Sequence, residues 1–237
     1  MRFLMREMEY EKPIASGRLR YEREGNPTGL VEAWRFTHAL EGFYFLRVEM
    51  DAHNPKDQEI CLYHVLLNPE MNIERLKFRY FGSRSEVEGD LQFDRDIISL
   101  NRVLIDKLEN RKKRQVEEIA VASDAVFWFP SMVGLGFASS KVTKDSQRSF
   151  LILDKDSSFA SRRGTAQFRW GDEEDRAVMR RNVAVRPCSI SWETFAVRLW
   201  LDEFNWPVGG LYADGLSATE IAYVRYEPVK DRRTRPV

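Results

Sequence analysis

In the segment from Arg75 to Phe81, charged and apolar residues alternate up to Tyr80. Because successive side chains of a β-strand point to opposite faces, this pattern predicts a strand with one face in the core and one in solvent. Trp192 to Asp202 alternates in the same way, and turn-forming residues separate such segments about every 8 to 15 positions. We therefore predict an all-β, antiparallel fold: a curved sheet or (half-)barrel of about a dozen strands with little helix.

Aromatic side chains on the apolar faces of these strands are predicted to point inward, into a core or the wall of a pocket. Six residues share this position: Trp34, Phe36, Phe78, Tyr80, Trp170 and Trp200. Arg198 lies on the same apolar face as Trp200, and a buried guanidinium needs an anionic partner. Arg198 is therefore a candidate for binding the acid group of a ligand. An internal salt bridge and an outward-facing strand surface are the alternatives.

The 237 residues are expected to form one antiparallel β domain, since no low-complexity linker divides the chain. The sequence from Phe78 to Gly82 is echoed from Phe168 to Gly171. A duplication of a β half, near residues 1–120 and 145–237, is one interpretation of this echo. Chance similarity between two amphipathic strands is the other.

The charge balance argues against a nucleic-acid partner. Lys+Arg and Asp+Glu each number 37, so the formal net charge is zero, whereas nucleic-acid-binding domains usually carry a basic excess. Only Lys230 to Arg235 is locally basic, which is typical of a solvated chain end. Cys61 and Cys188 have no partners at metal-ligand spacing. We expect buried free thiols, no metal site and no cofactor.

The first residues, Met1 to Tyr10, are charged and lack the apolar core of a signal peptide. No apolar run reaches the roughly 18 to 20 residues that a membrane-spanning helix requires. The sequence alone therefore predicts a cytoplasmic protein with no transmembrane segment.

The longest nearly uncharged apolar run extends from Ala125 to Ser140. Its start suits the end of a buried strand, and Pro130 ends that strand because proline donates no backbone hydrogen bond. The remainder is rich in glycine, which disfavours a helix, so we expect a mobile apolar loop. Such a loop covers a core, forms the wall or lid of a ligand pocket, or docks on another chain, as in a homodimer. The residues predicted to border a pocket are Phe127, Trp128, Phe129, Met132, Leu135 and Phe137.

No catalytic signature accompanies this run. The three histidines, His38, His53 and His64, fall on strands or in a turn, and a structural role is expected for each. Nucleophile-elbow, zinc-protease and phosphate-loop motifs do not occur. The acidic residues leave carboxylate acid–base chemistry open without selecting a pair. The sequence therefore does not decide whether the protein is an enzyme.

From Phe43 to Ala138 the chain presents successive amphipathic strands, a bulge-like stretch from Glu88 to Leu91, and an apolar segment at Phe129-Pro130. This order resembles the open β half-barrels that carry lipids, such as the periplasmic lipoprotein carriers and the glycolipid-binding family. The resemblance covers less than half of the chain and contains no specific motif. It implies a concave sheet that shelters an acyl or other amphipathic ligand. The lack of a signal peptide departs from the periplasmic carriers.

Three functions fit these observations. The preferred one is non-catalytic binding or carrying of an apolar or amphipathic, lipid-like small molecule in a concave β-sheet. The second is an enzyme that acts on a hydrophobic small molecule in the same type of pocket. The third is a protein-interaction module that docks through the apolar loop 125–140.

Overall fold

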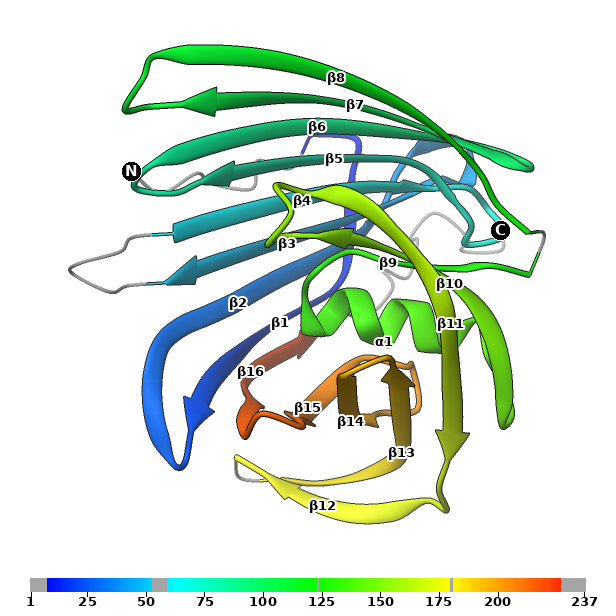
Figure 1. Ribbon diagram of the computed structural model, residues 1–237. Helices are drawn as coiled ribbons and strands as arrows, with labels where there is room; N and C mark the ends of the chain where they lie inside the picture. The colour runs from blue at the N-terminus through cyan, green and yellow to red at the C-terminus, as the bar shows by residue number, and fades with distance from the viewer. Residues whose placement is uncertain (1–7, 53–58, 123, 180, 227–237) are drawn as a thin grey trace.

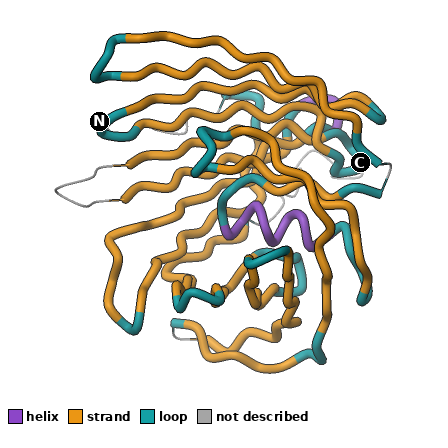
Figure 2. The backbone as a smooth tube through the Cα atoms, viewed as in Figure 1, coloured by secondary structure: helices purple, strands orange, loops and turns teal. Residues whose placement is uncertain are grey.

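The computed structural model describes residues 8–52, 59–122, 124–179 and 181–226. The expectations for most of the N-terminal stretch, for His53 and for Lys230–Arg235 lie outside these ranges. Within them the chain forms sixteen strands, one nine-residue α-helix and one short 3-10 helix, Leu40–Gly42 (Figure 1). Figure 2 shows how far strands dominate the chain.

The first half of the chain is a meander of eight strands: β1 (Lys12–Arg23), β2 (Asn26–His38), β3 (Tyr44–Ala52), β4 (Glu59–Leu67), β5 (Ile73–Phe81), β6 (Ser85–Asp94), β7 (Ile97–Asp106) and β8 (Arg111–Ala120). The second half begins with β9 (Val126–Trp128) and the helix α1 (Met132–Ser140). Its remaining strands are β10 (Ser146–Asp154), β11 (Ala160–Trp170), β12 (Glu174–Val178), β13 (Arg181–Trp192), β14 (Phe195–Leu201), β15 (Pro207–Tyr212) and β16 (Leu216–Arg225).

All the strands belong to one sheet. Its path runs from β8 back along the meander to β1, crosses to β16, and continues through β15, β14, β13, β11 and β10 to β9, with β12 paired to β13 beside the path. Neighbours are antiparallel except β9 and β10, which pair in parallel. The sheet does not close into a barrel, and its second half curls around α1 (Figure 1). The prediction of an antiparallel, curved all-β fold with little helix is confirmed.

The structure has more strands than the sequence suggests, and β15 is one reason. The sequence indicates a turn there, because Pro207, Gly209 and Gly210 favour turns. The structure shows a different use of the glycines. A Cβ atom on Gly210 would lie 2.6 Å from Sδ of Met132, and one on Gly209 would lie 2.8 Å from the carbonyl oxygen of Ala218. The glycines therefore let other chain segments approach β15 closely.

The expectation of a mobile loop after Pro130 is wrong. The segment is the helix α1, and all of its residues except the last are buried. Ser131 caps its N-terminus, with Oγ accepting the amide of Gly134 at 2.8 Å. Gly136 allows close packing, since a Cβ there would lie 3.0 Å from Cδ of Pro207. A helix that is apolar on every side is stable when it is enclosed by the core, which offsets the low helix propensity of glycine.

One contiguous apolar core fills the concave side of the sheet, and both halves of the chain contribute to it. Tyr63 of β4 packs against Phe129 with ring centroids 4.8 Å apart. Trp34 of β2 stacks on Trp206 at 4.4 Å. The space inside the curved sheet is thus occupied by the protein's own helix and side chains.

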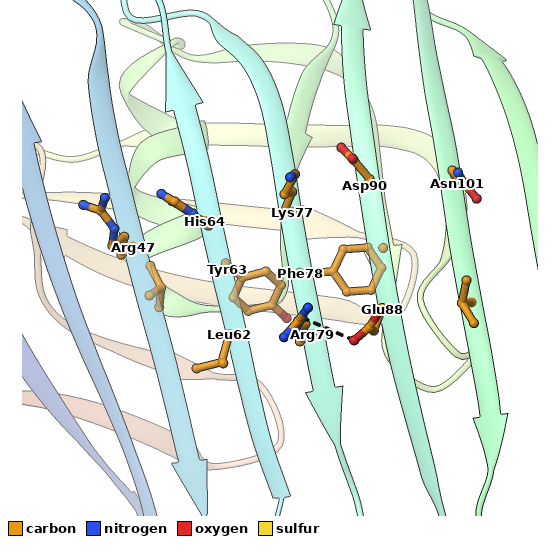
Figure 3. Close-up of a pocket in the computed structure, with 13 residues that line it drawn as sticks. Arg47, Leu62, Tyr63, His64, Lys77, Phe78, Arg79, Glu88, Asp90 and Asn101 are labelled. Carbon is orange, nitrogen blue, oxygen red and sulfur yellow. Dashed lines mark ion pairs between the residues drawn. The ribbon is translucent and has the colours of Figure 1, made fainter. Parts of the chain in front are cut away.

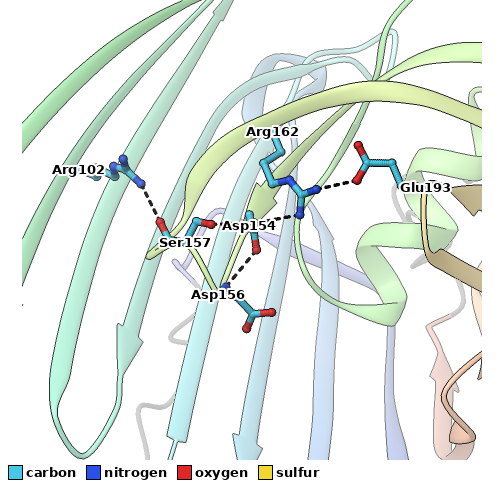
Figure 4. A network of polar contacts seen from close by, with 6 residues as sticks. All are labelled: Arg102, Asp154, Asp156, Ser157, Arg162 and Glu193. Atoms are coloured by element: carbon cyan, nitrogen blue, oxygen red, sulfur yellow. Dashed lines mark hydrogen bonds and ion pairs between the residues drawn. The ribbon is translucent and has the colours of Figure 1, made fainter.

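Arg102 ties the β10–β11 hairpin to the meander (Figure 4). Its side chain on β7 donates to the carbonyl oxygen of Ser157 at 3.5 Å and to the carboxylate of Glu117 at 2.7 Å. In the same hairpin, Asp154 accepts hydrogen bonds from the Ser157 hydroxyl at 2.9 Å and from Arg162 at 3.2 Å. These contacts fix the position of β10 across the concave side of the sheet.

Candidate functional site

Most of the aromatic and apolar residues predicted to line a pocket lie in the core. The buried ones are Trp34, Phe36, Phe78, Trp128, Phe129, Met132, Leu135 and Phe137. Phe78, for example, packs on the ring of Phe159 with centroids 4.8 Å apart. Met132 and Leu135 are fully buried within α1, so the expectation that they flank a moving lid is wrong. For the same reason α1 offers no exposed loop for docking on a partner chain.

Tyr80 and Trp170 are half-buried at the margin of this core. The Tyr80 hydroxyl donates to the carboxylate of Glu59 at 2.8 Å. The guanidinium of Arg186 lies 4.5 Å from the centroid of the Trp170 ring. Both side chains therefore combine apolar packing with a polar or charged neighbour.

A cavity of about 610 Å³, here called the end cavity, opens at one end of the sheet. It lies where the β4–β5 and β6–β7 turns meet β9, β10 and the C-terminal end of α1. Two of the predicted residues, Phe127 and Phe137, line it. Phe127 meets Phe93 edge to face, with ring centroids 5.0 Å apart. Further apolar side chains of the lining are Ile73, Ile98, Val121, Val126 and Leu151.

Polar and charged side chains surround the mouth of the end cavity. Arg148 and Asp124 form a salt bridge of 3.1 Å. Lys141, directly after α1, donates from Nζ to Oδ1 of Asn72 at 3.2 Å. An apolar lining with a few polar groups at fixed positions is the arrangement found in small-molecule sites. The chemistry of this cavity therefore suits a molecule with one apolar and one polar part.

A second groove, of about 550 Å³, lies on the outer face of β3 to β7 (Figure 3). Each of the five strands contributes one polar side chain to a row that crosses the groove, because the residues that carry these side chains pair with one another in register. The row consists of Arg47, His64, Lys77, Asp90 and Asn101. Its charges are largely paired within the protein. Glu11 binds Arg47, Arg75 binds Asp90, and Arg79 lies 3.3 Å from Glu88. This groove therefore combines paired charges with apolar side chains of its lining, such as Leu62 and Val103.

Arg198 and Trp200 lie on the outer face of β14. The prediction that Trp200 faces the interior is wrong, whereas for Arg198 the structure shows the outward-facing strand surface that is one of the alternatives. Arg198 is exposed and borders a third groove, of about 460 Å³, on that face. Trp200 is half-buried, with the Arg176 guanidinium 3.7 Å from its ring centroid and its indole nitrogen donating to Glu174 at 2.9 Å. Because β12 packs over this part of the outer face, an apolar side chain there is covered without belonging to the main core.

Glu32 is a buried carboxylate that the sequence analysis missed. Its Oε2 accepts the Tyr21 hydroxyl at 2.5 Å and the amide of Met132 at 3.0 Å, and its Oε1 accepts the amide of Val133 at 2.9 Å. Burial raises the pKa of Glu32, and these hydrogen bonds oppose the rise. Glu32 and Trp34 are two positions apart on β2, so their side chains point to the same face of the sheet. This spacing is the signal in the sequence that indicates an inward-facing Glu32. It lines none of the three cavities, so its observed role is to hold the N-terminus of α1.

Cys61 and Cys188 are buried free thiols, as predicted. Burial raises the pKa of each thiol to about 12. Because the thiolate is the reactive form of cysteine, neither side chain is an activated nucleophile. Across the described ranges, no three His, Cys, Asp or Glu side chains gather as a metal site requires.

Comparisons with known protein families, with curated proteins and with solved structures find no match to this chain. In the part of the chain that the structure describes, no helix has the length and apolar character needed to cross a membrane. Inference about function therefore starts from the chemistry of the end cavity.

Proposed function

We propose that the protein binds or carries a small amphipathic, lipid-like molecule whose apolar part lies in the end cavity. One observation carries this proposal: an aromatic and aliphatic lining ends at a polar, charged mouth. The volume of about 610 Å³ lies within the roughly 300 to 1,000 Å³ typical of small-molecule sites. A molecule of this kind would satisfy both parts of the cavity at once.

The proposed site differs in position from the one that the sequence suggests. The concave side of the sheet is filled by α1 and the core, whereas the end cavity opens beside them. The resemblance of residues 43–138 to open β half-barrels that carry lipids points to the same class of ligand. The proposal retains that class and moves the ligand to the end of the sheet.

Chain length provides a direct test. Each methylene moved from water to an apolar lining contributes about 0.8 kcal/mol, which corresponds to a roughly fourfold change in Kd. We expect the affinity for straight-chain fatty acids, measured by displacement of a polarity-sensitive dye, to rise by about this factor per carbon. The rise should stop when the cavity is full. Saturable binding to the folded protein is the minimum requirement.

A pair of matched variants locates the site. Phe127→Thr removes a half-buried ring from the end cavity and keeps a residue that favours strands. Leu211→Thr removes an apolar side chain from the third groove, on the outer face of β15. We expect Phe127→Thr to weaken fatty-acid binding about tenfold and Leu211→Thr to leave it unchanged. Equal Kd values for the two variants, or no saturable binding to the wild type, would refute the proposed site.

A further inference from the structure

Lys141 occupies a specific position at the mouth of the end cavity. It is the C-cap of α1, and its backbone amide bonds to the carbonyl oxygens of Ala138 and Ser139. Its side chain crosses to the β4–β5 turn, where Nζ donates to Oδ1 of Asn72 at 3.2 Å. The ammonium also lies 5.6 Å from the centroid of the Phe137 ring, which lines the cavity. The positive charge therefore stands where the apolar lining meets the polar rim.

The carboxylates at this mouth leave Lys141 without an ionic partner. Asp124 is paired with Arg148 at 3.1 Å. Glu74 accepts the side-chain amide of Asn68 at 2.9 Å. Among the described residues, no carboxylate of the lining lies within salt-bridge distance of the Lys141 ammonium; the hydrogen bond from its side chain goes to a neutral amide.

The surroundings of Lys141 favour the arrival of an anion. Lys141 is exposed as a residue, but the protein covers part of its side chain, and this loss of hydration lowers the pKa of the ammonium. The Phe137 ring supplies only a weak attraction to the cation. Charge-assisted hydrogen bonds to a carboxylate or phosphate are the strongest contacts that an ammonium makes.

We propose that the ligand of the end cavity is an amphiphile with an anionic head group, a carboxylate or a phosphate, and that Lys141 binds this group at the mouth. The inference rests on the proposed function and names its ligand class. The tail would lie on the aromatic lining around Phe127 and Phe137. The head group would replace the amide of Asn72 as the partner of the ammonium.

Three ligands of ten carbon atoms each test the assignment: decanoate, decyl phosphate and decanol. We expect the wild type to bind both anions at least about tenfold more tightly than the alcohol. Lys141→Met keeps the length of the side chain and removes its charge. It should reduce the affinity for the anions to about that for decanol, with decanol binding unchanged. Lys141→Arg should retain the preference, because the charge is kept.

Lys144→Met is the matched control, since Lys144 follows in the same loop and does not line the cavity. It should leave all three affinities unchanged, and circular dichroism should show that each variant is folded. The tighter of the two anions in the wild type identifies the head group as carboxylate or phosphate.

The two proposals fail in different ways. If Lys141→Met weakens decanol and decanoate equally, or if the wild type binds all three ligands alike, the anionic assignment is wrong and the proposed function stands. If none of the three ligands binds saturably to the folded wild type, the proposed function fails and the assignment falls with it. An anion preference that disappears in Lys144→Met as well would also overturn the role of Lys141.

Discussion

The carboxylate of Glu32 on β2 accepts the backbone amide of Val133 in the first turn of α1, with Oε1 and N 2.9 Å apart. The first amides of a helix have no partner within the helix. The positive end of the helix dipole also attracts a carboxylate. Glu32 therefore fixes the N-terminus of α1 against a strand that lies 101 positions earlier in the sequence.

We expect Glu32→Gln to lower the free energy of unfolding by about 2 to 3 kcal/mol, as measured by urea denaturation. Glutamine has a single acceptor oxygen, so its amino group would face donors that the carboxylate now satisfies. Glu24→Gln, at an exposed turn position, should change stability by less than about 0.5 kcal/mol. Identical urea midpoints for Glu32→Gln and the wild type would show that apolar packing alone holds the helix.

Gly210 is expected to be intolerant of a side chain. A Cβ atom there would lie 2.6 Å from Sδ of Met132, so Gly210→Ala should cost about 1 to 3 kcal/mol through overpacking. Met132→Ala removes the side chain that would be displaced, although it has a cost of its own. In a double-mutant cycle monitored by thermal unfolding, the double variant should be more stable than the sum of the single changes implies. Additive effects would contradict the proposed contact.

Local pattern is enough to predict some parts of the fold and not others. The alternation from Arg75 to Phe81 predicts β5, because a half-buried strand shows its two faces in the sequence itself. For α1 and β15 the deciding contact is tertiary. Gly136 and Gly210 disfavour regular structure locally. What they contribute is the close approach of α1 and β15, and this contact is visible only in the tertiary structure. The burial of Trp200 on an outer face likewise depends on β12, which follows from no pattern in β14.

The candidate site is only partly visible in the sequence for the same reason. Phe127 and Phe137 belong to the conspicuous apolar run, so both are predicted and both line the end cavity. Phe93 lies near the end of β6, and Lys141 directly follows a helix that the sequence does not predict. Turns that are distant in the chain meet at one end of the sheet, and only the strand order shows which turns these are.

The ion pair between Glu11 and Arg47 should make stability depend on acidity. Both side chains are almost completely buried, and Thr37 donates to the same carboxylate at 2.6 Å. Burial by itself would raise the pKa of Glu11, but hydrogen bonds from Arg47, Thr37 and the Met8 amide hold this pKa below its ordinary value of 4.5. An acid with a lowered pKa in the folded state stabilises the fold above its unfolded pKa. This contribution is lost as the pH falls through the folded pKa.

Glu11→Gln should therefore cost about 3 to 5 kcal/mol at pH 7, because it leaves a buried guanidinium without its anion. The difference from the wild type should narrow as the pH is lowered below about 4.5, when the wild-type carboxylate is progressively protonated. Urea denaturation at several pH values measures both effects. Glu88→Gln affects an exposed pair with Arg79 and should cost less than about 1 kcal/mol at any pH. A constant difference for Glu11→Gln across the pH range would contradict this account.

Leu135 is expected to tolerate no charge. It is fully buried in α1, and an unpaired carboxylate in the core costs several kcal/mol, which is comparable to the total stability of about 5 to 15 kcal/mol of a typical domain. Leu135→Asp should therefore abolish the near-ultraviolet circular dichroism of the tertiary structure and the cooperative thermal transition. Leu108→Asp, at a position that is 76% exposed, should preserve both.

The variant Leu135→Asp also separates the three roles that the sequence leaves open for this segment. A core side chain predicts loss of the fold, because the charge cannot reach water without unpacking α1 from β15. A lid predicts a folded protein that no longer binds fatty acids. A docking surface predicts a folded protein that loses a dimer on size-exclusion chromatography. Because α1 is enclosed, we expect the first outcome. A folded Leu135→Asp protein that shows either of the other two changes would instead indicate that this segment is a lid or a docking surface.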